Sequence, residues 1–161
     1  MSPLKRREEL RSLSEDHHNA LVIALRCRRL AAGQHDADPV ELWAGVLEFF
    51  RLAILPHFDL EETLLLPAID AIGEPETSKM TERIRDEHRR LRAMIADPVP
   101  DGAGWTALGT LLDEHIRFEE RVVFEATQDR LPLEVLEEIA RVSAEIAQIC
   151  PTTFRPIPRG Q

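Results

Sequence analysis

The chain has 161 residues, of which 43% are hydrophobic and 30% charged, and its formal net charge is −9. This size and apolar content suit one domain with its own core, and the acidic balance argues against nucleic acid or an anionic membrane surface as a partner. The two cysteines, Cys27 and Cys150, form neither a disulfide framework nor a cysteine-based zinc pattern. We therefore expect reduced thiols in a cytoplasmic protein.

In chain order, the spacing of apolar residues predicts five helices, over residues 8–32, 39–72, 76–96, 105–129 and 132–149. Gly33 and Gly73 end the first two, while Pro39 and Pro132 open the second and the fifth. Long helices joined by short loops are typical of bundles. We predict an all-α fold, an up-down-up-down four-helix bundle with a short additional C-terminal helix, over residues 8–150. A Pro-rich C-terminal tail follows over residues 151–161.

Pro56 interrupts the pattern of the second helix. It stands directly before His57, where a proline removes one backbone hydrogen bond and kinks or breaks a helix. The segment is therefore either two shorter helices or one helix with a kink that aims His57 inward. Pro67 is expected to end the regular part of the same helix early.

A ten-residue pattern occurs twice, as HFDLEETLLL from His57 and as HIRFEERVVF from His115. Each copy places a His and a Glu four positions apart, which is about one helical turn. His57 and Glu61 therefore share one helix face, and His115 and Glu119 share another. An imidazole beside a carboxylate is a chelating pair for a first-row transition metal, so two facing pairs predict a dinuclear site.

The other two long helices offer further imidazoles. His88 lies on an apolar stripe, and its position on a neighbouring helix favours a ligand over a core residue. Alignment of the first helix with the His88 region favours His18, since Leu21 and Leu25 follow it at +3 and +7, but His17 stays open as a ligand or a supporting donor. His35 is expected to be solvated in its loop. Glu62 and Glu120, which directly follow the paired Glu residues, are expected to face solvent.

These segments together resemble hemerythrin-like proteins of the HHE cation-binding domain family. The resemblance spans about Ser14 to Ala126, and the segments that carry it are SEDHHNALVIAL, FFRLAILPHFDLEETLLLP, RIRDEHRRLRAMI and LGTLLDEHIRFEERVVFEA. It implies a four-helix bundle around a non-haem di-iron site. It also implies terminal ligands at His18 or His17, His57, His88 and His115, with Glu61 and Glu119 bridging the ions.

The chain differs from the oxygen-carrying hemerythrins of invertebrates. Those have a second His four positions from the one on the third helix and an Asp on the fourth. Here the positions four residues either side of His88 are Ile84 and Arg92, and Glu119 stands in place of the Asp. A site with fewer imidazoles has more open coordination positions, which makes reversible oxygen carriage a less natural role than sensing or stress response.

The resemblance implies two iron ions (Fe2+/Fe3+) with bridging oxo or hydroxo, and zinc is a possible occupant after purification. We expect a metal-binding protein that takes a small diatomic or peroxide ligand, namely O2, NO or peroxide, and no catalytic residue is assigned. The alternatives are a di-iron enzyme of oxidative or nitrosative defence, and a bundle for metal storage or zinc. No nucleic acid or membrane partner is expected, whereas a homodimer or an unknown protein partner fits the acidic surface and the fifth helix.

Overall fold

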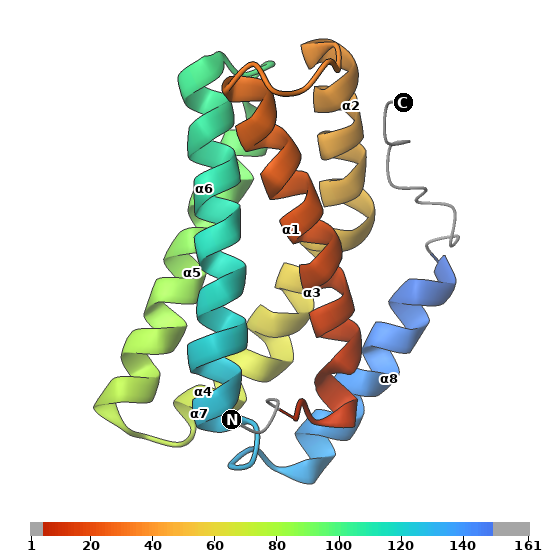
Figure 1. The fold of residues 1–161 in the computed structure, drawn as a ribbon. Helices are drawn as coiled ribbons and strands as arrows, with labels where there is room; N and C mark the ends of the chain where they lie inside the picture. The colour runs from red at the N-terminus through yellow and green to blue at the C-terminus, as the bar shows by residue number, and fades with distance from the viewer. Residues whose placement is uncertain (1–4, 150–161) are drawn as a thin grey trace.

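The computed structural model describes residues 5–149, and every regular element within that range is helical (Figure 1). A 3-10 turn, Glu8–Leu10, leads into α1 (Arg11–Ala31). The later α-helices are α2 (Pro39–Phe49), α3 (Leu55–Leu60), α4 (Leu66–Asp70), α5 (Pro75–Ala96), α6 (Gly102–Phe118), α7 (Phe124–Thr127) and α8 (Leu133–Ile149). The all-α prediction is thus confirmed over these residues, and the arrangement is compatible with a four-helix bundle. The predicted tail over 151–161 lies outside the described residues.

Three π-helical turns join shorter α-helices into continuous rods. They are η2 (Phe50–Ile54), η3 (Glu61–Leu65) and η4 (Glu119–Val123). After each turn, a backbone N–H donates to the carbonyl five residues earlier, as Leu66 does to Glu61 and Phe124 does to Glu119. The second predicted helix is therefore one rod from Pro39 to Asp70, and the fourth is one rod from Gly102 to Thr127.

Pro56 does not break its rod. Proline cannot donate to the carbonyl four residues earlier, and its ring crowds that carbonyl. The π-helical turn η2 comes just before it and widens the backbone there, with Leu55 N–H bonded to the Phe50 carbonyl. Pro67 follows η3 in the same way. The helix therefore accommodates both prolines through a wider turn, and neither of the two outcomes expected at Pro56, a break or a simple kink, describes the backbone fully.

Counted in chain order, the four rods are α1, Pro39–Asp70, α5 and Gly102–Thr127. The first and fourth rods pack most closely. Side by side in Figure 1, α1 and α6 make the most extensive contact between two helices, and α5 packs against α4 and α6. Gly109 permits this approach, since a Cβ at that position would stand 2.7 Å from the backbone oxygen of Ala24 and 2.7 Å from Cγ of Arg28. The fifth helix, α8, lies against α1 and α3, outside the four rods.

The buried apolar side chains form two clusters rather than one. The first contains Trp43, Phe49, Phe50, Phe58, Trp105 and Leu112 with their neighbours. The second contains Leu10, Leu13, Leu65, Ile84, Phe124 and Ile139 with theirs. On α1, Leu13 belongs to the second cluster and Ala20 to the first, so His17, which is buried between them, marks the boundary. A layer of buried polar groups at this level separates the two apolar regions.

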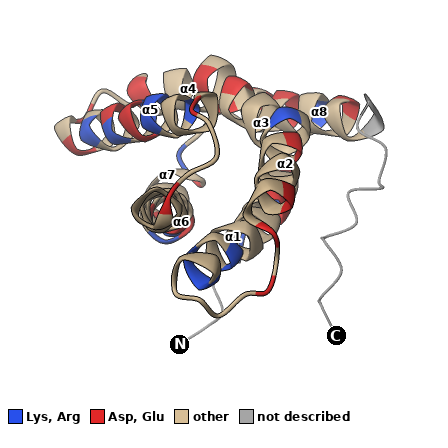
Figure 2. Cartoon of the chain, turned by 90° about the horizontal axis from the view of Figure 1, so that it is seen from above, with Lys and Arg blue, Asp and Glu red and all other residues tan. Residues whose placement is uncertain are grey.

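Acidic and basic residues are interspersed along α5 in Figure 2, and its arginines pair with neighbouring carboxylates, as Arg85 does with Asp70 at 2.8 Å and Arg89 does with Asp86. Such exposed pairs contribute little to stability. Among the described residues, none of the helices combines the length and apolar character that crossing a membrane requires.

Candidate metal centre

Six buried side chains converge on the polar layer from all four rods. Each is at most 3% exposed. His17 comes from α1, His57 from α3, His88 from α5 and His115 from α6, while Glu61 and Glu119 open the π-helical turns η3 and η4. The structure therefore brings together the His/Glu pairs of both ten-residue repeats and one imidazole from each of the other two long helices.

The six side chains fall into two overlapping groups of four. His17 and His57 form the first group with Glu61 and Glu119, and His88 and His115 form the second with the same two carboxylates. Within each group the donor atoms all lie within 4.8 Å of one another. Both carboxylates thus stand between two imidazole pairs, which is the arrangement that two bridged metal ions require.

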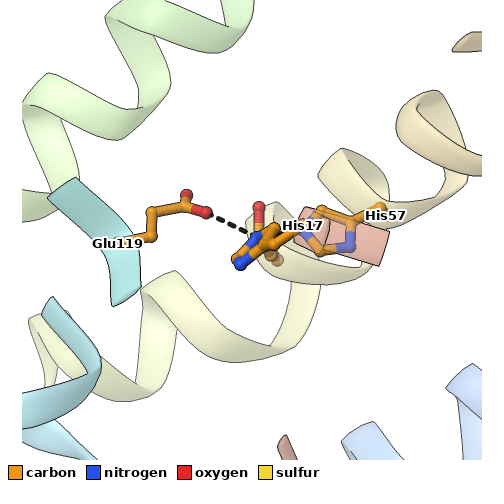
Figure 3. Close-up of side chains that lie close together, drawn as sticks. His17, His57 and Glu119 are labelled. Carbon is orange, nitrogen blue, oxygen red and sulfur yellow. Dashed lines mark hydrogen bonds and ion pairs between the residues drawn. The ribbon is translucent and has the colours of Figure 1, made fainter. Parts of the chain in front are cut away.

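All four imidazoles present Nε2 to the centre. In the first pair, the Nε2 atoms of His17 and His57 lie 3.0 Å apart, and His17 Nε2 lies 2.9 Å from a Glu119 oxygen (Figure 3). His57 Nε2 lies 3.0 Å from a Glu61 oxygen. In the second pair, Nε2 of His88 lies 3.3 Å from Glu61, and Nε2 of His115 lies 3.3 Å from Glu119. These contacts place nitrogen and oxygen donors around a common interior.

The helix α1 contributes His17 and not His18. His17 is 3% exposed, whereas His18 is exposed and lies outside both donor groups. The alignment that favoured His18 took Leu21 and Leu25 as the buried stripe, whereas Leu25 is 40% exposed. The buried positions beside His17 are instead Leu13, Ala20 and Ala24. Small alanines fill that stripe because α6 packs closely on it.

Most of the donor atoms at the centre lack hydrogen-bond partners within the described part of the chain. Both carboxylate oxygens of Glu61 and of Glu119 are buried and unsatisfied, and so is Nε2 of His88 and of His115. Leaving such groups unpaired in an apolar interior is costly. A bound cation would satisfy all of them at once, so the residues present fit a transition-metal site with imidazole and carboxylate ligands.

The outward nitrogen of every imidazole meets a carboxylate. His17 Nδ1 lies 2.7 Å from Glu120 and His57 Nδ1 lies 3.1 Å from Asp16. Likewise, His88 Nδ1 lies 2.8 Å from Glu62, and His115 Nδ1 lies 2.8 Å from Glu87. A carboxylate that accepts the Nδ1 proton fixes the tautomer that leaves Nε2 free to ligate, and it raises the basicity of the ligand.

Two of these outer carboxylates correct the expectation from sequence. Glu62 and Glu120 do not simply face solvent, because their side chains are 30% and 25% exposed and each contacts an imidazole on another rod. The other two, Asp16 and Glu87, were not singled out from the sequence. The signal was present: each directly precedes a buried His, and a one-residue step turns a side chain about 100° around the helix, toward the neighbouring rod.

The carboxylates also determine how the centre holds protons when no ion is bound. Burial opposes charge on His17, but Glu119 and Glu120 outweigh it and raise the pKa of His17 to about 9. Burial opposes ionisation of Glu120 too, yet the contact with His17 lowers its pKa to about 2. His57, despite its burial, has a raised pKa because of Glu61 and Asp16, and the pKa of Glu61 is held well below its usual value by His57 and His88. A metal ion must therefore displace protons from this cluster.

Aromatic rings line the centre on both sides. The ring of Phe58 stacks on His88 with centroids 3.8 Å apart, and Phe124 lies nearly parallel to His17 with centroids 5.7 Å apart. Together with the two apolar clusters, they exclude bulk water and fix the orientation of two imidazoles. His35, by contrast, is half-buried in the loop after α1, where its Nδ1 accepts from Ala37 N–H, and it lies outside both donor groups.

Comparison with known proteins agrees with this geometry. The model of the hemerythrin HHE cation-binding domain matches residues 9–127, a range that contains all six central side chains. Neither a curated protein nor a solved structure matches the chain. The family match covers most of the chain and the whole of the buried centre, so the chain belongs to the hemerythrin HHE cation-binding domain family.

Proposed function

We propose that the chain holds two iron ions in the buried layer of an up-down-up-down four-helix bundle and binds a small ligand there, in sensing or stress response. The observation that carries this proposal is that the two donor groups share Glu61 and Glu119. A shared pair of carboxylates distinguishes a dinuclear centre from two separate sites. Membership of a cation-binding family supports the same conclusion.

The assignment of ligands is part of this proposal. His17 and His57 would hold one ion, His88 and His115 would hold the other, and the two glutamates would bridge them. Two imidazoles and two shared carboxylates give each ion four protein donors, which leaves open positions on an ion that prefers six. Bound iron would supply open positions for O2, NO or peroxide, and in its Fe2+ state it would also supply electrons for reversible binding of O2.

The residues of the chain restrict which ligand can enter. The central side chains are nearly fully buried, and the donor atoms of each group of four lie within 4.8 Å of one another, so each group is too compact to admit a large ligand. Phe58 and Phe124 form apolar walls against two of the imidazoles. The outer carboxylates hold each Nδ1 proton, so in the metal-loaded protein Nε2 would act as a metal ligand and not as an acid. These features favour binding of a diatomic or peroxide ligand over chemistry on a large substrate.

Metal content and colour test the proposal. After anaerobic loading with Fe2+ and removal of the excess, we expect two iron ions per chain and an absorption band in the visible after exposure to air. Slow, reversible decay of that band supports a binding protein, whereas rapid repeated consumption of peroxide would replace this function with an enzyme of oxidative defence. A colourless protein that retains stoichiometric zinc and takes up no iron would contradict the proposal.

A matched pair of variants tests the ligand assignment. His17→Ala removes one donor from the first group, and we expect the metal content to fall from two ions toward one. His18→Ala changes an exposed neighbour on the same helix and should keep two ions per chain. Metal loss in His18→Ala with full content in His17→Ala would reverse the assignment on α1.

A further inference from the structure

The segment before α1 is fastened to the end of the fourth rod. Gln128 holds it through both atoms of its side-chain amide: Oε1 accepts from the backbone N–H of Arg7 at 3.1 Å, and Nε2 donates to the carbonyl of Lys5 at 3.3 Å. Arg6 also donates to the same Oε1 at 3.2 Å. Gln128 is only 6% exposed, so this contact is part of the folded interior and not a surface touch.

Arg6 reaches from this segment to a carboxylate of the metal centre. Its Nη2 donates to Oε2 of Glu120 and to the backbone carbonyl of the same residue, both at 2.8 Å. Its guanidinium lies 4.8 Å from the centroid of the Phe124 ring, and its side chain is 14% exposed. The other oxygen of Glu120 accepts from Ser14 at 2.6 Å and faces Nδ1 of His17 at 2.7 Å. A continuous set of contacts therefore runs from Gln128 through Arg6 and Glu120 to His17.

The opposite half of the centre is supported from within one long helix. Glu62, behind His88, is held by Arg92 at 2.7 Å, and Glu87, behind His115, is held by Arg83 at 2.8 Å. Both arginines belong to α5, which also carries His88. The Arg83–Glu87 contact lies within one helix, the Arg92–Glu62 contact joins two helical segments, and neither depends on a non-helical segment.

The half formed by His17 and His57 has weaker supports. Glu120 depends on a short non-helical segment near the N-terminus. Asp16, behind His57, is 39% exposed and makes the longest of the four Nδ1 contacts, at 3.1 Å. Over residues 5–149, no arginine or lysine is paired with Asp16. A short non-helical segment lacks the repeated backbone hydrogen bonds of a helix and opens locally more readily than a helix interior, so the support of His17 is the one most easily lost.

We infer that residues 5–7 act as a strap that positions His17, with Arg6 acting through Glu120, and that the metal position of His17 and His57 is the weaker of the two. The inference rests on the proposed dinuclear function. Arg6 is a positioning residue, since it touches Glu120 and not the donor atoms. The strap thus links the order of the N-terminal segment to the occupancy of one metal position.

Stepwise titration with Co2+ tests the strap. Metal-free wild type should bind two ions with two resolved affinities, followed through the visible absorption of Co2+. Arg6→Gln should weaken the weaker step about tenfold and leave the tighter step unchanged. Arg92→Gln, which removes the corresponding support on the other half, should weaken the tighter step instead. Arg6→Lys keeps the positive charge and should restore part of the loss.

Several outcomes would overturn the inference. They are an Arg6→Gln titration that superimposes on wild type, one in which both steps weaken equally, and a wild type with two equal affinities. Wild type that binds no Co2+ would instead contradict the proposed function itself. If Arg6→Gln fails to fold, Gln128→Ala loosens the same segment without touching Glu120, and it should weaken the same step. Circular dichroism of each metal-free variant checks that the helices are intact.

Discussion

The two helical hairpins, residues 11–70 and 75–127, build matching halves of one centre from unequal sequences. Their second rods share the ten-residue repeat, and its Glu opens a π-helical turn in both, at Glu61 and at Glu119. Their first rods share little beyond a carboxylate followed by a buried His, Asp16-His17 in one and Glu87-His88 in the other. The two hairpins therefore keep the same spacing of the central His and Glu side chains, whereas the residues around those side chains differ.

The hairpins differ in how they pack and in how their rods are bent. The first rod of one hairpin meets the second rod of the other closely at Gly109, whereas the position 58 residues earlier is Arg51, an exposed residue. Pro56 and Pro67 follow the π-helical turns of the first hairpin, and no proline follows the turn at Glu119. The turns at Glu61 and Glu119 occupy equivalent positions of the repeat, and only the first is followed closely by a proline. Proline is therefore not what creates these turns.

The largest effect should come from removing either shared carboxylate. Glu61→Ala or Glu119→Ala takes one donor from both groups of four, so each variant should lose nearly all bound metal. Each also removes the carboxylate that faces Nε2 of two buried imidazoles, which should lower the free energy of unfolding by about 3–5 kcal/mol. Metal analysis and urea unfolding of the two variants measure both effects.

Equal losses in the two variants would support equivalent hairpins. Glu114→Ala, an exposed residue on α6, is the control and should keep its metal. Full metal content in both bridging variants would show that the centre is not built on these carboxylates.

The next effect tests the close contact between α1 and α6. Gly109→Ala places a methyl group 2.7 Å from a backbone oxygen that cannot move aside, so the helices must shift. We expect about 1–3 kcal/mol of destabilisation, measured by thermal or urea unfolding. Gly102→Ala is the matched control because a Cβ there meets nothing within 4 Å. Equal stability of Gly109→Ala and wild type would mean that the tight contact is absent in solution.

A pH effect of similar or smaller size should appear in the metal-free protein. The pKa of His17 is raised from 6.5 to about 9 on folding, so its contribution to stability is complete below pH 6.5 and is lost as the pH rises through 9. Unfolding in urea with a chelator should show a loss on the order of 1–3 kcal/mol between pH 6 and pH 9. The metal-loaded protein should not show this loss, because the ion replaces the proton. Stability of the metal-free form that rises over this interval would contradict the assignment.

The smallest effect concerns the prolines of the first hairpin. Pro67→Ala should change stability by less than about 1 kcal/mol and leave two ions bound, because the equivalent turn at Glu119 forms without proline. Metal analysis and thermal unfolding are sufficient. Loss of one or both ions in Pro67→Ala would show that the first hairpin needs its proline to hold Glu61, and that the two turns are not equivalent.

Much of the centre could be predicted from sequence because helical spacing alone brings His and Glu at i and i+4 to one face. The pairs His57–Glu61 and His115–Glu119 needed no further information. His88 was predictable because leucine and isoleucine mark its stripe. The sequence left His17 and His18 as alternatives because the stripe of His17 consists partly of alanines, which mark a close helix contact only after the partner helix is known.

The outer carboxylates and the π-helical turns show what local patterns leave out. Whether Glu120 faces solvent or His17 depends on where α1 lies, and this is a property of packing between distant segments. A π-helical turn at Glu119 has no local signal, since the turn contains ordinary helix-forming residues. Pro56 did signal an irregularity, but propensity alone could not tell a broken helix from a widened one.

The polar layer between the two apolar clusters should affect how long the folded chain persists in a cell. Without an ion, a newly made chain leaves buried oxygen and nitrogen atoms unsatisfied in the layer between its two apolar clusters. Ligands that bind only the folded form raise its stability in proportion to the logarithm of their free concentration. Chains made under metal starvation should therefore spend more time open and be degraded sooner, so the amount of this protein would follow the supply of its metal.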